Sequence, residues 1–388
     1  MKVLYATYRY DPQNPDLGSG LDYECYHAFL RAGFETPIVG PVTDTLSLLE
    51  RFEYGFWRWY KKLTGKGGLK FPLTTAWRSS SMLDHAIQTH KPDVVFSVFP
   101  PFFVFGHLKT PCVWYFDTTF LGQESEWPLY GRLPLALSVW EEKKALKDLT
   151  RVVTMSQWSK DILAHQYGVP AGHIEIVPLF AALPAGVIPD YVDVEKEKHL
   201  ETPLRILLVG RVYERKGIDI AIEIVRQLNE QGQPAHLTVC GFNEGIANAP
   251  FVTFVGPYSK SDPTQLRDYI GWYKWAHILL HPARFEAAGI VPSEAAAFGT
   301  PTITNDTGGL ATTVQHGESG IVLPRKSPPE AYVQAIRELM AQPERYYALC
   351  RSTRQRYEKV LNSQVAGERL VQILQDAVAQ SRYDRMAF

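Results

Sequence analysis

The sequence predicts an α/β protein of two Rossmann-like domains, each a doubly wound parallel sheet. Short apolar runs of strand type alternate with helical segments of about 10–15 residues, the pattern of parallel strands joined by crossover helices. The alternation breaks once, over residues 181–203, where Pro184, Pro189, Pro203 and a charged run favour a linker. A length of 388 residues suits two domains.

Strands are expected at 2–8, 36–39, 93–99, 112–116, 151–155 and 174–177 in the first half, and at 205–209, 235–240, 251–255, 278–281 and 301–304 in the second. Helices are expected at 20–32, 134–149, 156–168, 217–231, 264–275 and 290–298, with three more helical segments from 328 onward. The expected domain limits are 1–185 and 204–365, with 186–203 as the linker. Ligands of such folds bind at the carboxyl ends of strands, so we expect the site in a cleft between the domains.

Composition excludes several classes of protein. Hydrophobic residues make up 45% and charged residues 21%, as in ordinary globular proteins. A formal net charge of −1 gives no overall attraction to nucleic acid, so no nucleic-acid partner is expected. The widely spaced cysteines, Cys25, Cys112, Cys240 and Cys350, favour reduced thiols over a zinc site or disulfides. The strand-like opening MKVLYATYRY and the lack of a run of about 18 apolar residues predict a cytoplasmic protein, able to lie against the inner face of a membrane.

The segment 282–309, PARFEAAGIVPSEAAAFGTPTITNDTGG, carries the strongest functional signal. Glu286 lies in the loop after an expected strand, and Pro292 suits the first turn of the helix that follows. A strand–loop–helix turn of this kind binds anions, and Gly289 lets the backbone approach a phosphate. Glu294 suits the paired hydroxyls of a ribose, and Glu286 those of a hexose. For either carboxylate alone, the alternative is a favourable interaction with the helix dipole.

A second segment, LLVGRVYERKGID at 207–219, places Gly210, Arg211 and Lys216 after an apolar strand. Two cations at a strand end suit a diphosphate, and they would neutralise the charge of a departing nucleoside diphosphate. Considered alone, the segment is also compatible with surface cations in a loop.

Together these motifs resemble those of the family-4 retaining glycosyltransferases, which have the GT-B fold. The family's Gly-Arg…Lys-Gly segment matches Gly210, Arg211, Lys216 and Gly217, and its E-x7-E motif matches Glu286 and Glu294. Further matches are Ala295, Gly299, Pro301 and Gly308–Gly309. The resemblance covers about residues 205–325 and is weaker in the first half. It implies that residues 366–388 form a helix that crosses back to the N-terminal domain.

The resemblance also implies a role for each matched residue. Arg211 and Lys216 would hold the donor diphosphate, Glu286 the donor sugar and Glu294 the ribose. The backbone amides of Gly289, Ile290 and Val291 would hold the phosphate. The implied reaction moves a hexosyl unit from a nucleoside diphosphate sugar, such as a UDP- or GDP-hexose, to a sugar or lipid-linked acceptor. It retains anomeric configuration, needs no metal or cofactor, and suits polysaccharide, lipopolysaccharide or glycolipid synthesis.

Acceptor-side residues match the family less well. Gly18 and Gly20 of the loop DLGSG suit the family's glycine-rich loop facing the donor diphosphate, and an ordinary tight turn is the alternative. In WYFDTTF, Phe116 stands where many members have a His, so Asp117 is the candidate to orient the acceptor hydroxyl or receive its proton. The alternative for Asp117 is a turn cap. Thr312–Thr313 also departs from the Glu that many members have after the Gly-Gly pair.

The stretch 51–78 interleaves aromatic residues with seven cations and a single acid, Glu53. This pattern predicts an acceptor-binding or membrane-docking lobe on an anionic bilayer. Its alternative is a solvated helix whose aromatics pack on the domain, and Trp57 and Trp59, two residues apart, would not share a helical face.

Two further functional interpretations remain open at this point. The chain could be a non-catalytic sugar-nucleotide-binding subunit, or a GT-B enzyme of another reaction, such as an epimerase or a phosphorylase.

Overall fold

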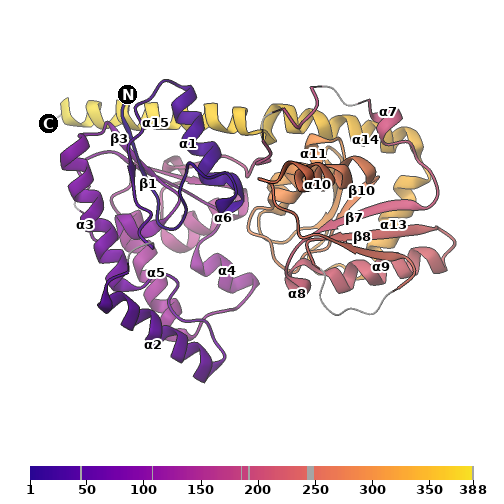
Figure 1. Ribbon diagram of the computed structural model, residues 1–388, viewed down its shortest axis with the longest axis horizontal. Coiled ribbons are helices and arrows are strands. Elements are labelled where there is room, and N and C mark those ends of the chain that lie inside the picture. The colour runs from indigo at the N-terminus through magenta and orange to yellow at the C-terminus, as the bar shows by residue number, and fades with distance from the viewer. Residues whose placement is uncertain (44–45, 107, 185, 191–192, 243–248, 387–388) are drawn as a thin grey trace. The chain divides into compact units, whose positions relative to one another are not determined.

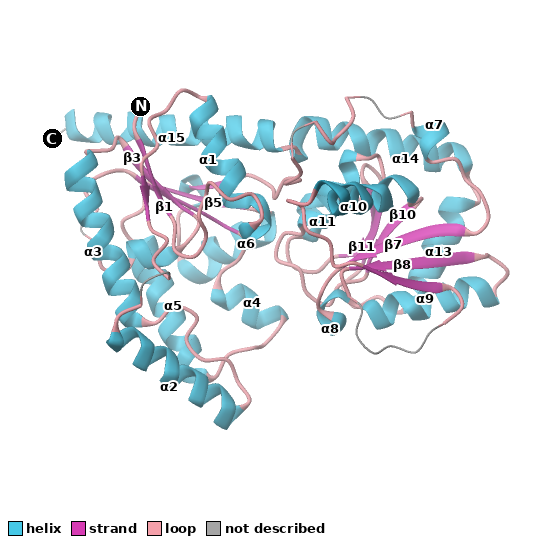
Figure 2. Cartoon of the chain, viewed as in Figure 1, coloured by secondary structure: helices cyan, strands magenta, loops and turns pink. Residues whose placement is uncertain are grey.

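The computed structural model describes residues 1–388 except 44–45, 107, 185, 191–192, 243–248 and 387–388. The chain forms two compact units: Met1–Val177 with Ala366–Phe388, and Pro178–Val365. Each unit contains a six-stranded parallel sheet with helices on its faces (Figures 1 and 2), which confirms the predicted α/β class of two Rossmann-like sheets. No helix of the described residues is long and apolar enough to cross a bilayer.

The first unit has the strand order β2-β1-β3-β4-β5-β6. Its strands are β1 (Val3–Ala6), β2 (Ile38–Val39), β3 (Val94–Ser97), β4 (Cys112–Phe116), β5 (Arg151–Thr154) and β6 (Ile174–Ile176). Its helices are α1 (Leu21–Arg31), α2 (Leu48–Thr64), α3 (Leu73–His90), α4 (Phe120–Glu126), α5 (Arg132–Leu146) and α6 (Gln157–Ile162), with shorter turns η1 (Leu17–Gly20), η2 (Pro100–Phe103), η3 (Leu163–Tyr167) and η4 (Ala171–His173).

The last helix, α15 (Ser363–Met386), carries the chain from the second unit back to the first. It packs on α1 so closely that a Cβ on Gly367 would lie 2.6 Å from the Cβ of Ala28. Arg369 also pairs with Glu175 at 2.9 Å. Helix α15 from Ala366 onward is thus part of the first unit's packing.

The second unit has the strand order β12-β11-β10-β7-β8-β9. Its strands are β7 (Leu204–Val209), β8 (Ala235–Cys240), β9 (Val252–Val255), β10 (Ile278–His281), β11 (Thr302–Asn305) and β12 (Gly320–Leu323). Its helices are α7 (Val194–Glu197), α8 (Tyr213–Lys216), α9 (Ile218–Glu230), α10 (Pro263–Trp275), α11 (Ile290–Ala297), α12 (Leu310–Thr313), α13 (Pro329–Met340) and α14 (Pro343–Arg356), followed by the turn η5 (Tyr357–Leu361).

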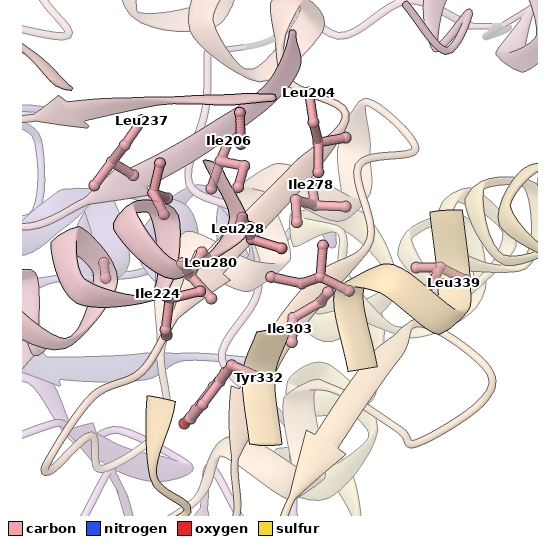
Figure 3. Close-up of a cluster of buried hydrophobic side chains, with 14 of the residues drawn as sticks. Leu204, Ile206, Ile224, Leu228, Leu237, Ile278, Leu280, Ile303, Tyr332 and Leu339 are labelled. Carbon is pink, nitrogen blue, oxygen red and sulfur yellow. The ribbon is translucent and has the colours of Figure 1, made fainter. Parts of the chain in front are cut away.

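The core of this unit has two layers because successive side chains of a strand point to opposite faces. Leu204, Ile206 and Leu208 of β7 pack with α9, α13 and α14 on one face, the cluster drawn in Figure 3. Leu207 and Val209 pack with α10 and α11 on the other. Both faces of the sheet are therefore covered, as a parallel sheet requires.

Residues 186–203, expected as a linker, include packed structure. Val194 of α7 belongs to the second unit's core. Lys198 is fully buried, and its ammonium donates to the carbonyls of Tyr273, Lys274 and Ala276 and to the hydroxyl of Thr300, at 2.7–3.1 Å. These contacts fix the segment at the end of α10.

In each sheet the chain adds strands first on one side and then on the other, so the order of the parallel strands reverses at one point. The reversal falls between β1 and β3 in the first unit and between β7 and β10 in the second. Ligands of open α/β sheets bind beside such a reversal, at the carboxyl ends of the strands. The loops after β7 and β10 carry the motifs 210–217 and 282–294, so the strongest sequence signals lie at the expected place.

Candidate functional site

Two glycines bring Lys216 into the site, because each allows its backbone to lie very close to a neighbouring residue. It ends the short helix α8, and its side chain runs over Gly210, where a Cβ would lie 2.6 Å from the lysine Cγ. Gly217 has φ of +66°, and a Cβ there would lie 2.1 Å from the Pro282 carbonyl oxygen. Only glycine fits both constraints at residue 217. These glycines let the loop after β7 meet the loop after β10 and bury Lys216.

The structure joins Lys216 to Glu286 in an ion pair between these two loops. Arg215 Nη1 lies 3.1 Å from the same carboxylate oxygen, and His281 Nε2 lies 3.7 Å from it. Burial raises the pKa of Glu286, but the charges of Lys216 and Arg215 outweigh burial and hold the pKa well below its usual value. Burial lowers the pKa of Lys216, and Glu286 opposes that decrease. Each partner thus favours the charged form of the other.

The Gly308–Gly309 pair holds the backbone of Glu286. Gly308 has φ of +53°, and a Cβ there would lie 2.2 Å from the Glu286 carbonyl oxygen. The Gly309 N–H donates to that oxygen at 3.1 Å. Thr313 belongs to the Thr312–Thr313 pair, which departs from the Glu that many members of the family have after the Gly-Gly pair. Its hydroxyl donates a hydrogen bond to the Ala288 carbonyl at 2.7 Å. The loop 286–288 is therefore fixed from the segment after β11.

Helix α11 begins directly after this loop. Gly289 precedes it with φ of +80°, and Ile290 and Val291 form its first residues, whose N–H groups have no partner within the helix. The helix dipole adds positive potential at this end. The predicted phosphate-binding residues thus occupy a helix N-terminus beside Glu286, as the sequence indicated.

Glu294 is fully buried one turn into α11, and both of its oxygens accept hydrogen bonds. Oε1 accepts from Lys260 Nζ at 2.6 Å. Oε2 accepts from the hydroxyls of Tyr269 at 2.6 Å and Tyr273 at 2.8 Å. Lys260 also donates to the Ala182 carbonyl at 3.0 Å. The carboxylate is therefore held in a single orientation by α10 and the loop before it.

Arg211, by contrast, is exposed. It follows the Gly210 turn, and its Cγ lies 3.5 Å from the position a Cβ would take on Gly241. The structure brings together Lys216, Glu286 and the start of α11, while Arg211 lies on the exposed surface after the Gly210 turn.

In the first unit, Gly18 and Gly20 lie between β1 and α1, the expected position. Gly18, Ser19 and Gly20 have φ of +57°, +61° and +83°, three successive left-handed residues. A Cβ on Gly18 would lie 2.8 Å from the ring of Tyr10. The loop lies at the strand reversal of the first sheet. The loop is therefore a tight turn of left-handed residues that follows β1 and leads into α1.

Asp117 lies exposed at the carboxyl end of β4 and accepts a hydrogen bond from the Thr118 N–H at 2.8 Å. Phe116, in the position of the family's His, is buried and stacks on Trp114 with ring centroids 3.9 Å apart. The side chain before Asp117 therefore belongs to the core, and Asp117 is the polar group that this strand end offers.

Sequence analysis did not single out several residues that contact the two carboxylates. They are Arg215 and His281 around Glu286, and Lys260, Tyr269 and Tyr273 around Glu294. Tyr269 and Tyr273 stand four residues apart, the spacing that places both on one helical face. His281 is the last residue of β10, next to the motif. The spacing of the two tyrosines and the position of His281 beside the motif are the sequence features from which these contacts could have been predicted.

Models of two glycosyltransferase families match the chain. The model described as "Glycosyltransferase Family 4" matches residues 23–181, and "Glycosyl transferases group 1" matches residues 192–356. The two matches follow one another along the chain, and together they contain every strand of both sheets except β1 and every residue of the Lys216–Glu286 site.

Curated relatives are glycosyltransferases. Alpha-D-kanosaminyltransferase of Streptomyces kanamyceticus is 20% identical over 72% of this chain and 74% of its own. The amylovoran biosynthesis glycosyltransferase AmsK of Erwinia amylovora is 25% identical over 56% of this chain and 54% of its own. D-inositol 3-phosphate glycosyltransferase 1 of Catenulispora acidiphila is 31% identical over 37% of each chain. The last two alignments thus span about half or less of either protein.

Solved structures share the fold over nearly the whole chain. Sucrose-phosphate synthase from Thermosynechococcus elongatus superposes with a TM-score of 0.70 at 17% identity, over 98% of this chain and 99% of its own. Anabaena Alr3699/HepE, solved with UDP-glucose, gives 0.62 at 14% identity, over 97% and 100%. The lipopolysaccharide-biosynthesis glycosyltransferase WaaG gives 0.59 at 17% identity, over 96% and 99%. The matching family models, the two parallel sheets and these neighbours agree, and the chain belongs to the family-4 glycosyltransferases with the GT-B fold.

Proposed function

We propose that this glycosyltransferase moves a hexosyl unit from a nucleoside diphosphate sugar to an acceptor hydroxyl, with retained anomeric configuration and without a metal. The observation that carries the proposal is the Lys216–Glu286 pair, which lies at the strand reversal of the second sheet beside the start of α11. A cation, a carboxylate and free backbone N–H groups are the groups that a sugar diphosphate needs. The UDP-glucose complex of the Anabaena neighbour supports a donor of this class.

In the proposed complex the diphosphate contacts Lys216, Arg211 and the N–H groups at Gly289, Ile290 and Val291. Glu286 accepts hydrogen bonds from the sugar hydroxyls. Burial lowers the pKa of Lys216, and the charge of Glu286 opposes that decrease and so favours the ammonium form that a phosphate would contact. Glu294 binds the ribose through Oε1 after Lys260 moves away from that oxygen, while Tyr269 and Tyr273 continue to hold Oε2.

Retention follows if the acceptor hydroxyl attacks from the face that the diphosphate leaves. The bond between the anomeric carbon and the phosphate oxygen breaks, the bond to the acceptor oxygen forms, and the leaving phosphate takes the acceptor proton. Lys216 and Arg211 stabilise the negative charge that grows on that phosphate. Asp117 orients the acceptor hydroxyl from the first unit, and Gly18 and Gly20 present backbone to the diphosphate.

The test begins with a thermal-shift screen against UDP-, GDP- and ADP-hexoses. A donor at 100 times its Kd stabilises the fold by about 2.7 kcal/mol. Turnover is then followed as release of nucleoside diphosphate with and without acceptor sugars and lipid-linked sugars, in the presence of EDTA. We expect release that depends on the acceptor, survives EDTA, and yields a product with the donor's anomeric configuration by NMR.

Other outcomes would each favour a different function. Conversion of one donor sugar into another without release of diphosphate would indicate an epimerase. Sugar phosphate formed from a glycan and inorganic phosphate would indicate a phosphorylase. Donor binding without any turnover would indicate a binding subunit. Lys216→Ala, if folded and as fast as the wild type, would exclude the proposed role of Lys216.

A further inference from the structure

Helix α2 separates the aromatic residues of the segment 51–78 into two sets. Trp57 is 8% exposed and packs toward the unit. Phe52 and Trp59 are 77% and 57% exposed, and they share the outer face with Leu48, Leu49, Phe56 and Leu63, all exposed. Figure 1 shows α2 along the edge of the first unit, near α3 and α5. The alternative of a helix whose aromatics pack on the domain therefore holds for Trp57 but not for Phe52, Phe56 and Trp59, which are exposed.

The exposed apolar side chains form one continuous stripe. At about 100° per residue, Leu48, Leu49, Phe52, Phe56, Trp59 and Leu63 fall within about 100° of the helix circumference. A soluble helix normally turns a stripe of this width toward a core. Here the stripe faces away from the core, because another face of α2 already packs there.

Three interactions hold the inner face of α2 in place. Glu50 pairs with Arg78 at 2.7 Å and completes a capping box with Ser47. Glu53 accepts the N–H groups of Leu73 and Thr74 at the start of α3, at 2.9 and 3.0 Å. The Tyr54 hydroxyl lies 2.9 Å from that of Tyr8. The helix is therefore fixed in rotation, and the stripe cannot turn inward without breaking these contacts.

The same arrangement makes every exposed charged side chain of α2 positive. Its two carboxylates, Glu50 and Glu53, are the groups that bond inward. Arg51, Arg58, Lys61 and Lys62 are exposed, and none pairs with a carboxylate in the part of the chain that the structure describes. Arg51, Arg58 and Lys62 fall within about 40° of one another along one edge of the stripe. Lys66, just after the helix, adds a further exposed cation.

The apolar surface continues beyond the end of α2. The Gly67 N–H donates to the Leu129 carbonyl at 2.7 Å, and the Gly131 N–H donates to the Gly67 carbonyl at 3.2 Å. These bonds hold the loop before α5 beside the end of α2, and Leu129 and Leu133 are exposed there. Two neighbouring elements of the same unit thus expose apolar side chains.

We propose that this surface docks the protein on an anionic lipid bilayer, with α2 lying in the plane of the interface. The apolar stripe would enter the boundary between headgroups and acyl chains, and the cations along its edge would meet lipid phosphates. A second copy of the chain fits less well, because pairing two stripes would bring together two sets of like charges without an acid between them. The proposal concerns attachment and does not depend on the sugar-transfer reaction.

Co-sedimentation of the full chain with vesicles tests the proposal. We expect binding to phosphatidylcholine vesicles that contain about 30–40% phosphatidylglycerol, because this anionic lipid makes the vesicle surface negative. We expect little binding to vesicles of phosphatidylcholine alone. The triple change Arg51→Gln, Arg58→Gln, Lys62→Gln should weaken partition about 100-fold, the effect of three interfacial cations. Phe52→Ser with Trp59→Ser should abolish sedimentation.

The matched control is the triple change Lys143→Gln, Lys144→Gln, Lys147→Gln. These exposed lysines lie at the other end of α5 from Leu133, and the change alters net charge equally. We expect this control to bind vesicles as the wild type does. Thermal unfolding checks that every variant is folded, and quenching by brominated lipid should affect Trp59 and be smaller in Trp59→Phe.

Three results would overturn the proposal: no binding of the wild type to anionic vesicles, equal loss in the control triple, or undiminished binding of the Phe52→Ser, Trp59→Ser variant. A dimer that dissociates in that variant, without vesicle binding, would assign the surface to a second copy instead. Equal binding to neutral and anionic vesicles would contradict the role given to the cations.

Discussion

Lys216→Met removes the ammonium from the site while keeping most of the side chain that covers Gly210. Glu286 would then be a buried carboxylate without its nearest partner, with Arg215 still 3.1 Å from one oxygen. Removing one member of a buried ion pair costs about 3–5 kcal/mol. Because Arg215 remains and the side chain of Glu286 is 14% exposed, we expect a smaller loss, about 2 kcal/mol at pH 7.

The effect on turnover should exceed the effect on folding. If Lys216 stabilises charge on the leaving phosphate, its loss should lower kcat about 10²–10³-fold, as for other groups that stabilise charge in a transition state. Urea unfolding measures the first effect, and acceptor-dependent release of nucleoside diphosphate measures the second. Lys359→Met, at an exposed lysine of the same unit, is the control for the charge change.

A double-mutant cycle with Glu286→Gln isolates the pair. The two single changes should each destabilise the fold, and the double variant should be more stable than their sum predicts, with a coupling of about 1–3 kcal/mol. Additivity within about 0.5 kcal/mol would refute the ion pair as a determinant of stability. A folded Lys216→Met variant with normal kcat would refute the catalytic role separately.

Further predictions concern neighbouring groups. Glu286→Gln should make the free energy of unfolding depend less on pH in acid. The pKa of Glu286 is lowered in the folded state, so the carboxylate contributes stability above about pH 4.5 that is lost as pH falls below it. Glu141 is buried, and its carboxylate oxygens have no hydrogen-bond partner among the residues that the structure describes. Burial raises its pKa to about 9, so stability should fall as pH rises from about 4.5 to 9. Glu141→Gln should remove that slope and stabilise the fold at pH 8 by about 1–4 kcal/mol; an unchanged pH profile would contradict it. Gly308→Ala should cost more than Gly317→Ala by at least about 1 kcal/mol, since both have positive φ but only residue 308 meets the Glu286 carbonyl; equal costs would contradict this. Lys260→Met should weaken thermal stability by about 1–3 kcal/mol by unpairing Glu294, while an unchanged melting temperature would show that the tyrosines suffice.

The sequence predicts the sheets well because their signal is local. The apolar run Leu204–Val209 is a strand that is buried except at Arg205, and Ile278–His281 is a strand that is buried throughout; a glycine follows the first at residue 210. Both motifs then lie at strand ends, where parallel sheets place ligands. Helix α6 ends at Ile162, earlier than expected, because the chain continues as a wider turn to Tyr167 before Gly168.

The partners of the site residues could not be read from the sequence because they depend on long-range packing. Lys216 and Glu286 are 70 residues apart, and the pairing requires β10 to lie next to β7. Lys260 reaches Glu294 from a loop 34 residues away. The outward face of α2 was also not predictable, since its amphipathic pattern fits a helix with its apolar stripe on the core equally well.

The buried pair between Lys216 and Glu286 determines when the charges of the site become oriented. Water must reorient around a new charge each time one forms, whereas charges fixed by a fold are already oriented before a ligand arrives. Here the orientation is set by glycines at 210, 217 and 308, which force two loops of the second unit together. In the proposed reaction, the reorganisation that a growing phosphate charge would otherwise require at every turnover is completed once, when the chain folds.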